Sequence, residues 1–199
     1  VVVVNGWNDL KYFPDLSVEN TYRDIVRPRA TDWRLEPAGL DSLLCLSSIY
    51  RAVRTRLIWT VFGAEGRKLR ALDRTVRDEG LRQYESNLQA ICDFGRQHGI
   101  RVVLCKQARL PTRALPEELR GRTTYGWIGL DHARLVSAFE RLDSIIDQVA
   151  GRNGCAVIDM SSRFSGEGDV FKDHIHFTPA GSEAVAAFLA ERLRPMLAR

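Results

Sequence analysis

Three short runs of apolar residues alternate with amphipathic segments, and this alternation restricts the possible folds more than any other feature. The apolar runs are Val1–Val4, residues 100–107 and residues 155–159. Hydrophobic side chains recur every three or four residues over 72–98, 131–150 and the segment after Thr178. Because strands that alternate with helices form parallel sheets through helical crossovers, the sequence predicts an α/β fold.

The chain of 199 residues has the length of one domain, and we expect residues 10–98 to form an insertion within it. Proline-containing loops are expected over 5–37 and 107–129. Residues 40–62 have helical periodicity, but their arginines make them a poor membrane span. Both a helix packed on its own domain and a membrane-surface or lid helix fit this pattern.

Composition excludes several classes of protein. At 45% hydrophobic residues the chain is too apolar to be disordered. Its net charge of +4 comes without a compact basic run interleaved with aromatic residues, so we expect no nucleic-acid partner. The four cysteines form no CxxC pair, which argues against a zinc knuckle or a redox motif and leaves a disulfide open.

Polar residues follow each predicted strand. They are Asn5 to Asp9 after the first strand; Lys106, Gln107 and Arg109 after the second; and Asp159, Asp173, His174 and His176 after the third. Right-handed crossovers place the carboxyl ends of parallel strands at one edge of the sheet, where ligands bind in open α/β folds. This edge is therefore the predicted functional site.

Asp173 and His176 have the spacing of a carboxylate and a histidine that act together. Asp173 can accept a hydrogen bond from one ring nitrogen of His176, which leaves the other nitrogen free as a general base. The Asn8 amide could donate to a developing oxyanion, a contact worth about 3 kcal/mol. The alternatives are an Asx-type turn at Asn8 and Asp9, and a loop ion pair or helix-cap cluster at Asp173 and His176. His174 and His176 also form an H-x-H pair, but no third metal ligand has a suggestive spacing.

Two blocks, "GWND" at 6–9 and "DHIH" at 173–176, resemble the G-x-N-D and D-x-x-H blocks of the SGNH/GDSL hydrolase superfamily. The resemblance implies a three-layer α/β/α, flavodoxin-like fold and a serine esterase mechanism. It assigns His176 as the base, Asp173 as the residue that orients it, and Asn8 with Gly6 to the oxyanion hole. It implies no metal or organic cofactor.

The family's G-D-S nucleophile block has no counterpart here. Only five residues precede Gly6, and the similar "GLDSLL" at 39–44 follows no strand, so we read Ser42 as a helix residue. Ser161, Ser162 and Ser165 lack the strand-turn-helix setting of an activated serine. We therefore expect the chain to be the C-terminal part of such a domain, with its N-terminal strands and nucleophile before Val1 and with the first strand exposed along one edge.

The resemblance also implies a class of substrate, namely carboxylic esters of small molecules, carbohydrates or lipids. We assign Trp7 and Arg109 to substrate binding. An O-acyltransferase that uses the same residues and a non-catalytic module with this fold are the alternatives. The 40–62 helix and a segment before Val1 are the candidate routes of membrane association.

Overall fold

The computed structural model describes residues 1–10, 39–61 and 72–197. The chain divides into two compact units, of which the first comprises Val1–Asp15 with Ala71–Arg199 and the second Leu16–Arg70. The second unit thus interrupts the first, as an insertion does. It is shorter than the expected 10–98 insertion, because the helix over Asp78–Gln97 belongs to the first unit.

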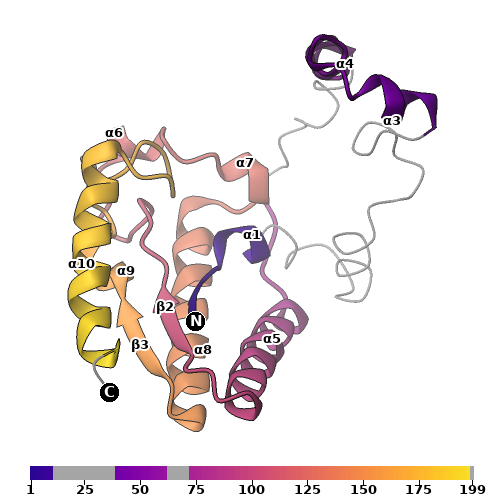
Figure 1. Cartoon of the computed structure of the whole chain (residues 1–199). Helices are drawn as coiled ribbons and strands as arrows, with labels where there is room; N and C mark the ends of the chain where they lie inside the picture. The colour runs from indigo at the N-terminus through magenta and orange to yellow at the C-terminus, as the bar shows by residue number, and fades with distance from the viewer. Residues whose placement is uncertain (11–38, 62–71, 198–199) are drawn as a thin grey trace. The chain divides into compact units, whose positions relative to one another are not determined.

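A three-stranded parallel sheet forms the centre of the first unit. Its strands are β1 (Val2–Val4), β2 (Val103–Lys106) and β3 (Ala156–Asp159), and their order in the sheet is β1-β2-β3. In the register Val3 is paired with Leu104, which is paired with Val157. The three predicted strands and their parallel direction are confirmed, so their carboxyl ends share one edge (Figure 1).

Helices form the rest of the first unit as it is described. They are α1 (Trp7–Leu10), α5 (Asp78–Gln97), α6 (Glu117–Arg120), α7 (Tyr125–Ile128), α8 (His132–Asn153), α9 (Met160–Phe164) and α10 (Pro179–Leu197). The predicted start of α10 is confirmed, because Thr178 Oγ1 accepts a hydrogen bond from the Gly181 amide at 3.0 Å. The 107–129 segment, predicted as a loop, contains the short helices α6 and α7.

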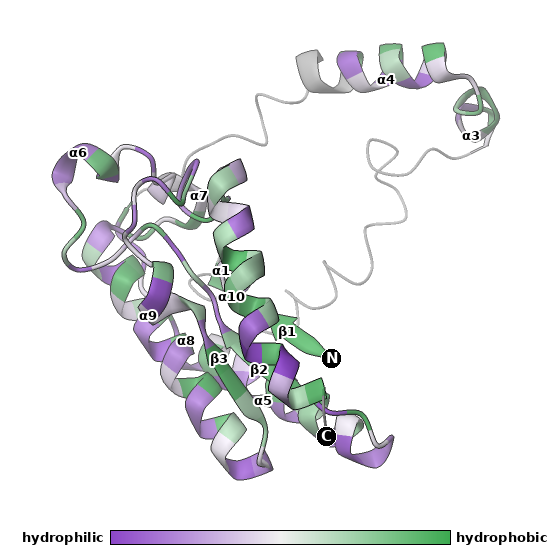
Figure 2. Cartoon of the chain, turned by 60° about the vertical axis from the view of Figure 1, so that its left-hand side comes forward, coloured by the Kyte–Doolittle hydropathy of each residue, from purple (hydrophilic) through white to green (hydrophobic). Residues whose placement is uncertain are grey.

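Hydrophobic side chains gather in two clusters. The larger joins α5 and α8 to the sheet through residues such as Tyr84, Leu104 and Phe139, and the smaller joins α9 and α10 to it through Phe164 and Val185. Helices therefore lie on both faces of the sheet (Figure 1), and in Figure 2 the strands are mainly hydrophobic whereas the helices carry both hydrophilic and hydrophobic residues. The architecture is mixed α/β, as the alternating pattern predicts.

The first strand is less buried than its sequence suggests. Four consecutive valines predict burial on both faces, yet Val2 is 41% and Val4 46% exposed. Among the described residues β1 pairs only with β2, so β1 is the edge of the sheet. The expected exposed edge is therefore present in this structure.

The described part of the second unit contains α3 (Leu40–Leu44) and α4 (Ser48–Val61). One continuous helix over 40–62 was predicted, and this is wrong, because the chain turns between the two helices. Asp41 holds the turn by accepting hydrogen bonds from Tyr50 Oη at 2.8 Å and Arg54 Nε at 2.9 Å. Ser42 lies in α3 as expected. In the described ranges no helix combines the length and apolarity needed to cross a bilayer.

Gly181 lets α10 approach the loop that carries Asp173 and His176. A Cβ atom at Gly181 would collide with the carbonyl oxygen of Val170. We expect Gly181→Ala to lower the free energy of unfolding by about 2 kcal/mol, since backbone must move to admit the methyl group. Gly151 in α8 has nothing within 4 Å of its Cβ position, so Gly151→Ala is the matched control. The control should gain about 0.5–1 kcal/mol in urea denaturation, and equal effects of the two substitutions would contradict this packing.

Candidate active site

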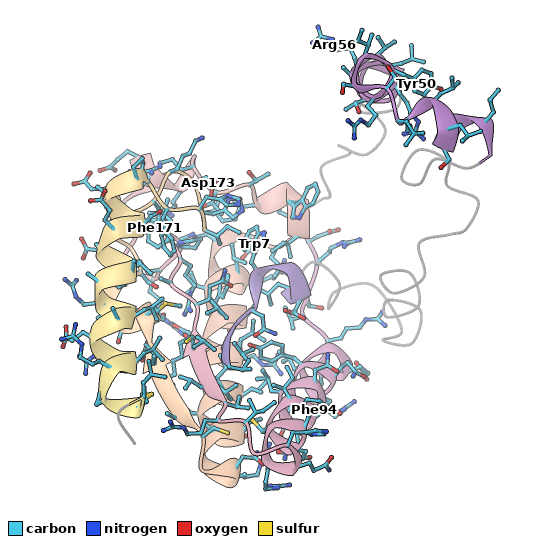
Figure 3. The ribbon with its side chains drawn as sticks, in the orientation of Figure 1. Trp7, Tyr50, Arg56, Phe94, Phe171 and Asp173 are labelled. Atoms are coloured by element: carbon cyan, nitrogen blue, oxygen red, sulfur yellow. The ribbon has the colours of Figure 1, made fainter. Side chains whose placement is uncertain are left out.

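The candidate site lies at the carboxyl edge of the sheet. Trp7 begins the short helix that follows β1, and Asp173 lies in the loop that leads from α9 to α10. Figure 3 shows both side chains at this end of the molecule. The backbone amide of Leu110, beyond β2, donates to the His174 carbonyl oxygen at 2.9 Å and so ties the loop to the sheet.

Asp173 organises its own loop. Its Oδ1 atom accepts hydrogen bonds from the backbone amides of Ile175 at 3.0 Å and His176 at 2.9 Å. Its Oδ2 atom lies 2.7 Å from Nδ1 of His176. The predicted contact between the two residues is thus present, and the turn around Asp173 fixes its direction.

These hydrogen bonds decide the charge of Asp173. Burial favours its neutral form, but the two amides and the His176 ring outweigh burial and lower the pKa of Asp173 to about 2. Asp173 is therefore ionised at neutral pH. Because its pKa is depressed on folding, its stabilising contribution is complete above about pH 4, the value for an unfolded aspartate, and is lost as the pH falls toward 2.

His176 has one ring nitrogen bound and the other open. Since ionised Asp173 can only accept, Nδ1 is assigned as the donor of this bond, and in the neutral form of the ring the lone pair is then on Nε2. The side chain is 70% exposed, and Nε2 has no hydrogen-bond partner in the part of the chain that the structure describes. A hydroxyl brought to Nε2 could therefore transfer its proton to this ring.

His174 has a different environment from His176. It is buried, its ring lies against Trp7 with centroids 4.0 Å apart, and its Nδ1 is 3.9 Å from Asp173 Oδ1. Burial lowers the pKa of His174 and so favours the neutral ring. The H-x-H metal alternative gains no support, because only His176 is open, and no cluster of three potential ligands exists within the described ranges.

The block at 6–9 is positioned by β2. Gly6 has φ = 147°, and the Trp7 amide donates to Gln107 Oε1 at 3.0 Å. A Cβ atom at Gly6 would lie 3.2 Å from that oxygen, so both the backbone angle and the close approach favour glycine. Asn8 is the second residue of α1, but its side chain lies outside what the structure describes. Its oxyanion role, with that of Gly6, stays a prediction.

Trp7 and Arg109, which we assigned to substrate binding, lie inside the molecule with exposed fractions of 4% and 6%. Trp7 lies between His174 and Phe139. The Arg109 guanidinium lies over the Phe139 ring and donates to Asp143 Oδ2 at 2.7 Å. Neither side chain is open to a ligand in this structure.

The three serines that closely follow β3, Ser161, Ser162 and Ser165, make hydrogen bonds within the fold and none to His176. The Ser162 amide donates to Asp159, which caps α9. Ser165 Oγ accepts a hydrogen bond from the Arg109 amide at 3.2 Å and lies 3.3 Å from Ser161 Oγ. No serine of the described ranges is hydrogen-bonded to His176.

Sequence reasoning did not find the stacking of His174 on Trp7 or the pairing of Arg109 with Asp143. Both join residues far apart in the chain, and no local pattern indicates them. Comparison of the chain with protein-family models, curated proteins and solved structures finds no match.

Proposed function

We propose that the protein is a serine-type hydrolase of carboxylic esters, in which His176 is the general base and Asp173 orients it. The observation that carries the proposal is the 2.7 Å contact between Asp173 Oδ2 and His176 Nδ1, with Nε2 open at the carboxyl edge of a parallel sheet. A surface ion pair could form anywhere on the molecule. A base that acts on a bound substrate has to lie where ligands bind, which in an open α/β fold is the carboxyl edge of the sheet.

The mechanism follows from the protonation states. The serine hydroxyl attacks the ester carbonyl while Nε2 of His176 takes its proton, and ionised Asp173 stabilises the resulting imidazolium. His176 then returns the proton to the leaving alcohol. Water deacylates the enzyme by the same route. Asn8 and the backbone near Gly6 are the proposed donors to the oxyanion.

We place the nucleophile on a strand that adds to the free side of β1 and precedes Val1 in the full protein. Two observations support this location. Ser161, Ser162 and Ser165 bond elsewhere, and the β-branched residues Val2 and Val4 are half-exposed on a strand whose outer edge pairs with no other strand among the described residues. The proposed complete fold is the three-layer, flavodoxin-like α/β/α sandwich of the SGNH family.

The proposal is tested by ester hydrolysis. The chain of residues 1–199 and a longer protein that includes the residues encoded before Val1 are compared on p-nitrophenyl acetate. We expect turnover by the longer protein alone, because only it contains the proposed serine. His176→Ala in the longer protein should lower kcat by about 10³-fold or more.

His98→Ala is the matched control, since His98 is exposed at the end of α5 and bonded to the Phe94 carbonyl. It should leave kcat unchanged. Turnover by residues 1–199 that is lost in His176→Ala would overturn the location of the nucleophile. An inactive longer protein, or one indifferent to His176→Ala, would overturn the function itself.

A further inference from the structure

Two of the four cysteines lie side by side, far from the candidate site. Cys92 is on the inner face of α5, and Cys155 follows the Gly154 cap of α8 just before β3. Their sulfur atoms are 3.4 Å apart, and both thiols are free. They are near the amino ends of the strands, whereas Asp173 and His176 belong to the carboxyl edge.

A cavity of about 620 Å³ opens beside this pair. Both cysteines line it, together with apolar residues from the start of β2 and the end of α10 such as Val103 and Met196. Cys155 is partly exposed, whereas Cys92 is only 3% exposed. A small molecule in the cavity therefore reaches the Cys155 sulfur more readily than that of Cys92.

We propose that Cys92 and Cys155 are a redox modification site, which reacts with a low-molecular-weight disulfide in this cavity and closes to an intramolecular disulfide. The proposal does not depend on the esterase function. Its geometric basis is the contact between two thiols from separate elements beside a space that admits the oxidant. The sulfur atoms must move from 3.4 Å to about 2.05 Å apart to form the bond.

The reaction balances in two exchange steps. The Cys155 thiolate attacks one sulfur of the small disulfide, which gives a mixed disulfide on Cys155 and releases one small thiolate. The Cys92 thiolate then attacks the Cys155 sulfur and releases the second small thiolate. The protein loses two electrons in all, the oxidant gains them, and the two protons from the cysteines pass to the released thiolates.

The second step is expected to be the slow one. Burial, followed by the hydrogen bond between the two thiols, raises the pKa of Cys92 to about 12, so little thiolate is present at neutral pH. Ring closure should therefore accelerate by nearly tenfold for each unit of pH between about 7 and 9.

The bond would join α5 to the residue that precedes β3, across 63 positions of the chain. A cross-link over a loop of this length removes much conformational freedom from the unfolded chain, so it should stabilise the folded first unit. Reduction would reverse the effect. The site would thereby couple the stability of the protein to the thiol redox state of its surroundings.

The test treats residues 1–199 carrying Cys45→Ser with oxidised glutathione and maps the products by peptide mass spectrometry. We expect a Cys92–Cys155 cross-link and a higher urea midpoint than in the sample reduced with dithiothreitol. Adding Cys92→Ser should stop the reaction at glutathione on Cys155. Adding Cys155→Ala should leave Cys92 unmodified.

Cys105 is the internal control, because it is buried in the other hydrophobic cluster and does not line the cavity. It should stay unmodified throughout. Glutathione retained on Cys155 beside a free Cys92, or a folded protein in which neither reacts, would overturn the proposal. An unchanged urea midpoint after cross-linking would overturn the stabilising role. Mapping the same products in the unsubstituted chain keeps the test decisive even if a cysteine variant fails to fold.

Discussion

Asp173→Asn is expected to lower kcat/KM for ester hydrolysis by about 10³–10⁴-fold in the protein that carries the nucleophile. Asparagine keeps an oxygen that can accept the Ile175 and His176 amides, so the loop should keep its turn. Its amide group, however, would face His176 Nδ1 as a donor and would favour the wrong tautomer. Catalysis should therefore fall steeply, while the urea midpoint should fall less than in Asp173→Ala, because a neutral amide oxygen makes weaker hydrogen bonds to the two backbone amides than a carboxylate does.

Two further variants separate catalysis from folding. Asp173→Ala removes the turn contacts as well, so it should lower both activity and stability. Asp169→Asn changes an exposed carboxylate of the same loop and should leave both unchanged. Activity of Asp173→Asn within tenfold of the parent would show that Asp173 does not orient a catalytic histidine.

Asp143→Ala is expected to lower the free energy of unfolding by about 3–5 kcal/mol, the largest stability effect that we predict. Asp143 is the carboxylate that accepts from the buried Arg109 guanidinium at 2.7 Å. Burial raises the pKa of Asp143, and the hydrogen bond and charge of Arg109 oppose that shift. Removing Asp143 would leave a buried cation without its carboxylate partner.

Glu140→Ala is the control, because Glu140 pairs with the exposed Arg113 and should cost less than about 1 kcal/mol. The double variant Asp143→Leu with Arg109→Met should recover most of the loss, since it removes both charges together. Urea denaturation of residues 1–199 measures all of these. A cost of Asp143→Ala no greater than that of Glu140→Ala would contradict a structural role for the pair.

The features that could be predicted from the sequence are local ones. Strands and helices follow from hydrophobic periodicity, and the contact of Asp173 with His176 spans only three positions. Thr178 and Pro179 mark the start of α10 by the preferences of capping residues. Placing the site at the carboxyl edge needed only the parallel direction of the strands.

What could not be predicted depends on tertiary contacts. Arg109 at a strand end looks like a ligand-binding cation until Asp143, 34 positions away, is seen to bind it. Trp7 likewise looks like a pocket wall, but it packs beneath His174. The break between α3 and α4 depends on Asp41, whose side chain bonds forward to Tyr50 and Arg54. The four valines predict a strand, but they do not indicate which strands pair with it.

The central claim is that His176 activates a serine, and covalent labelling tests it most directly. A fluorophosphonate reacts with an activated serine, and mass spectrometry then locates the adduct. In the protein that includes the residues before Val1, we predict one adduct on a serine preceding Val1, formed at least about 10²-fold more slowly in His176→Ala and unchanged in His98→Ala. Labelling that is indifferent to His176→Ala, or no labelling at all, would contradict the account.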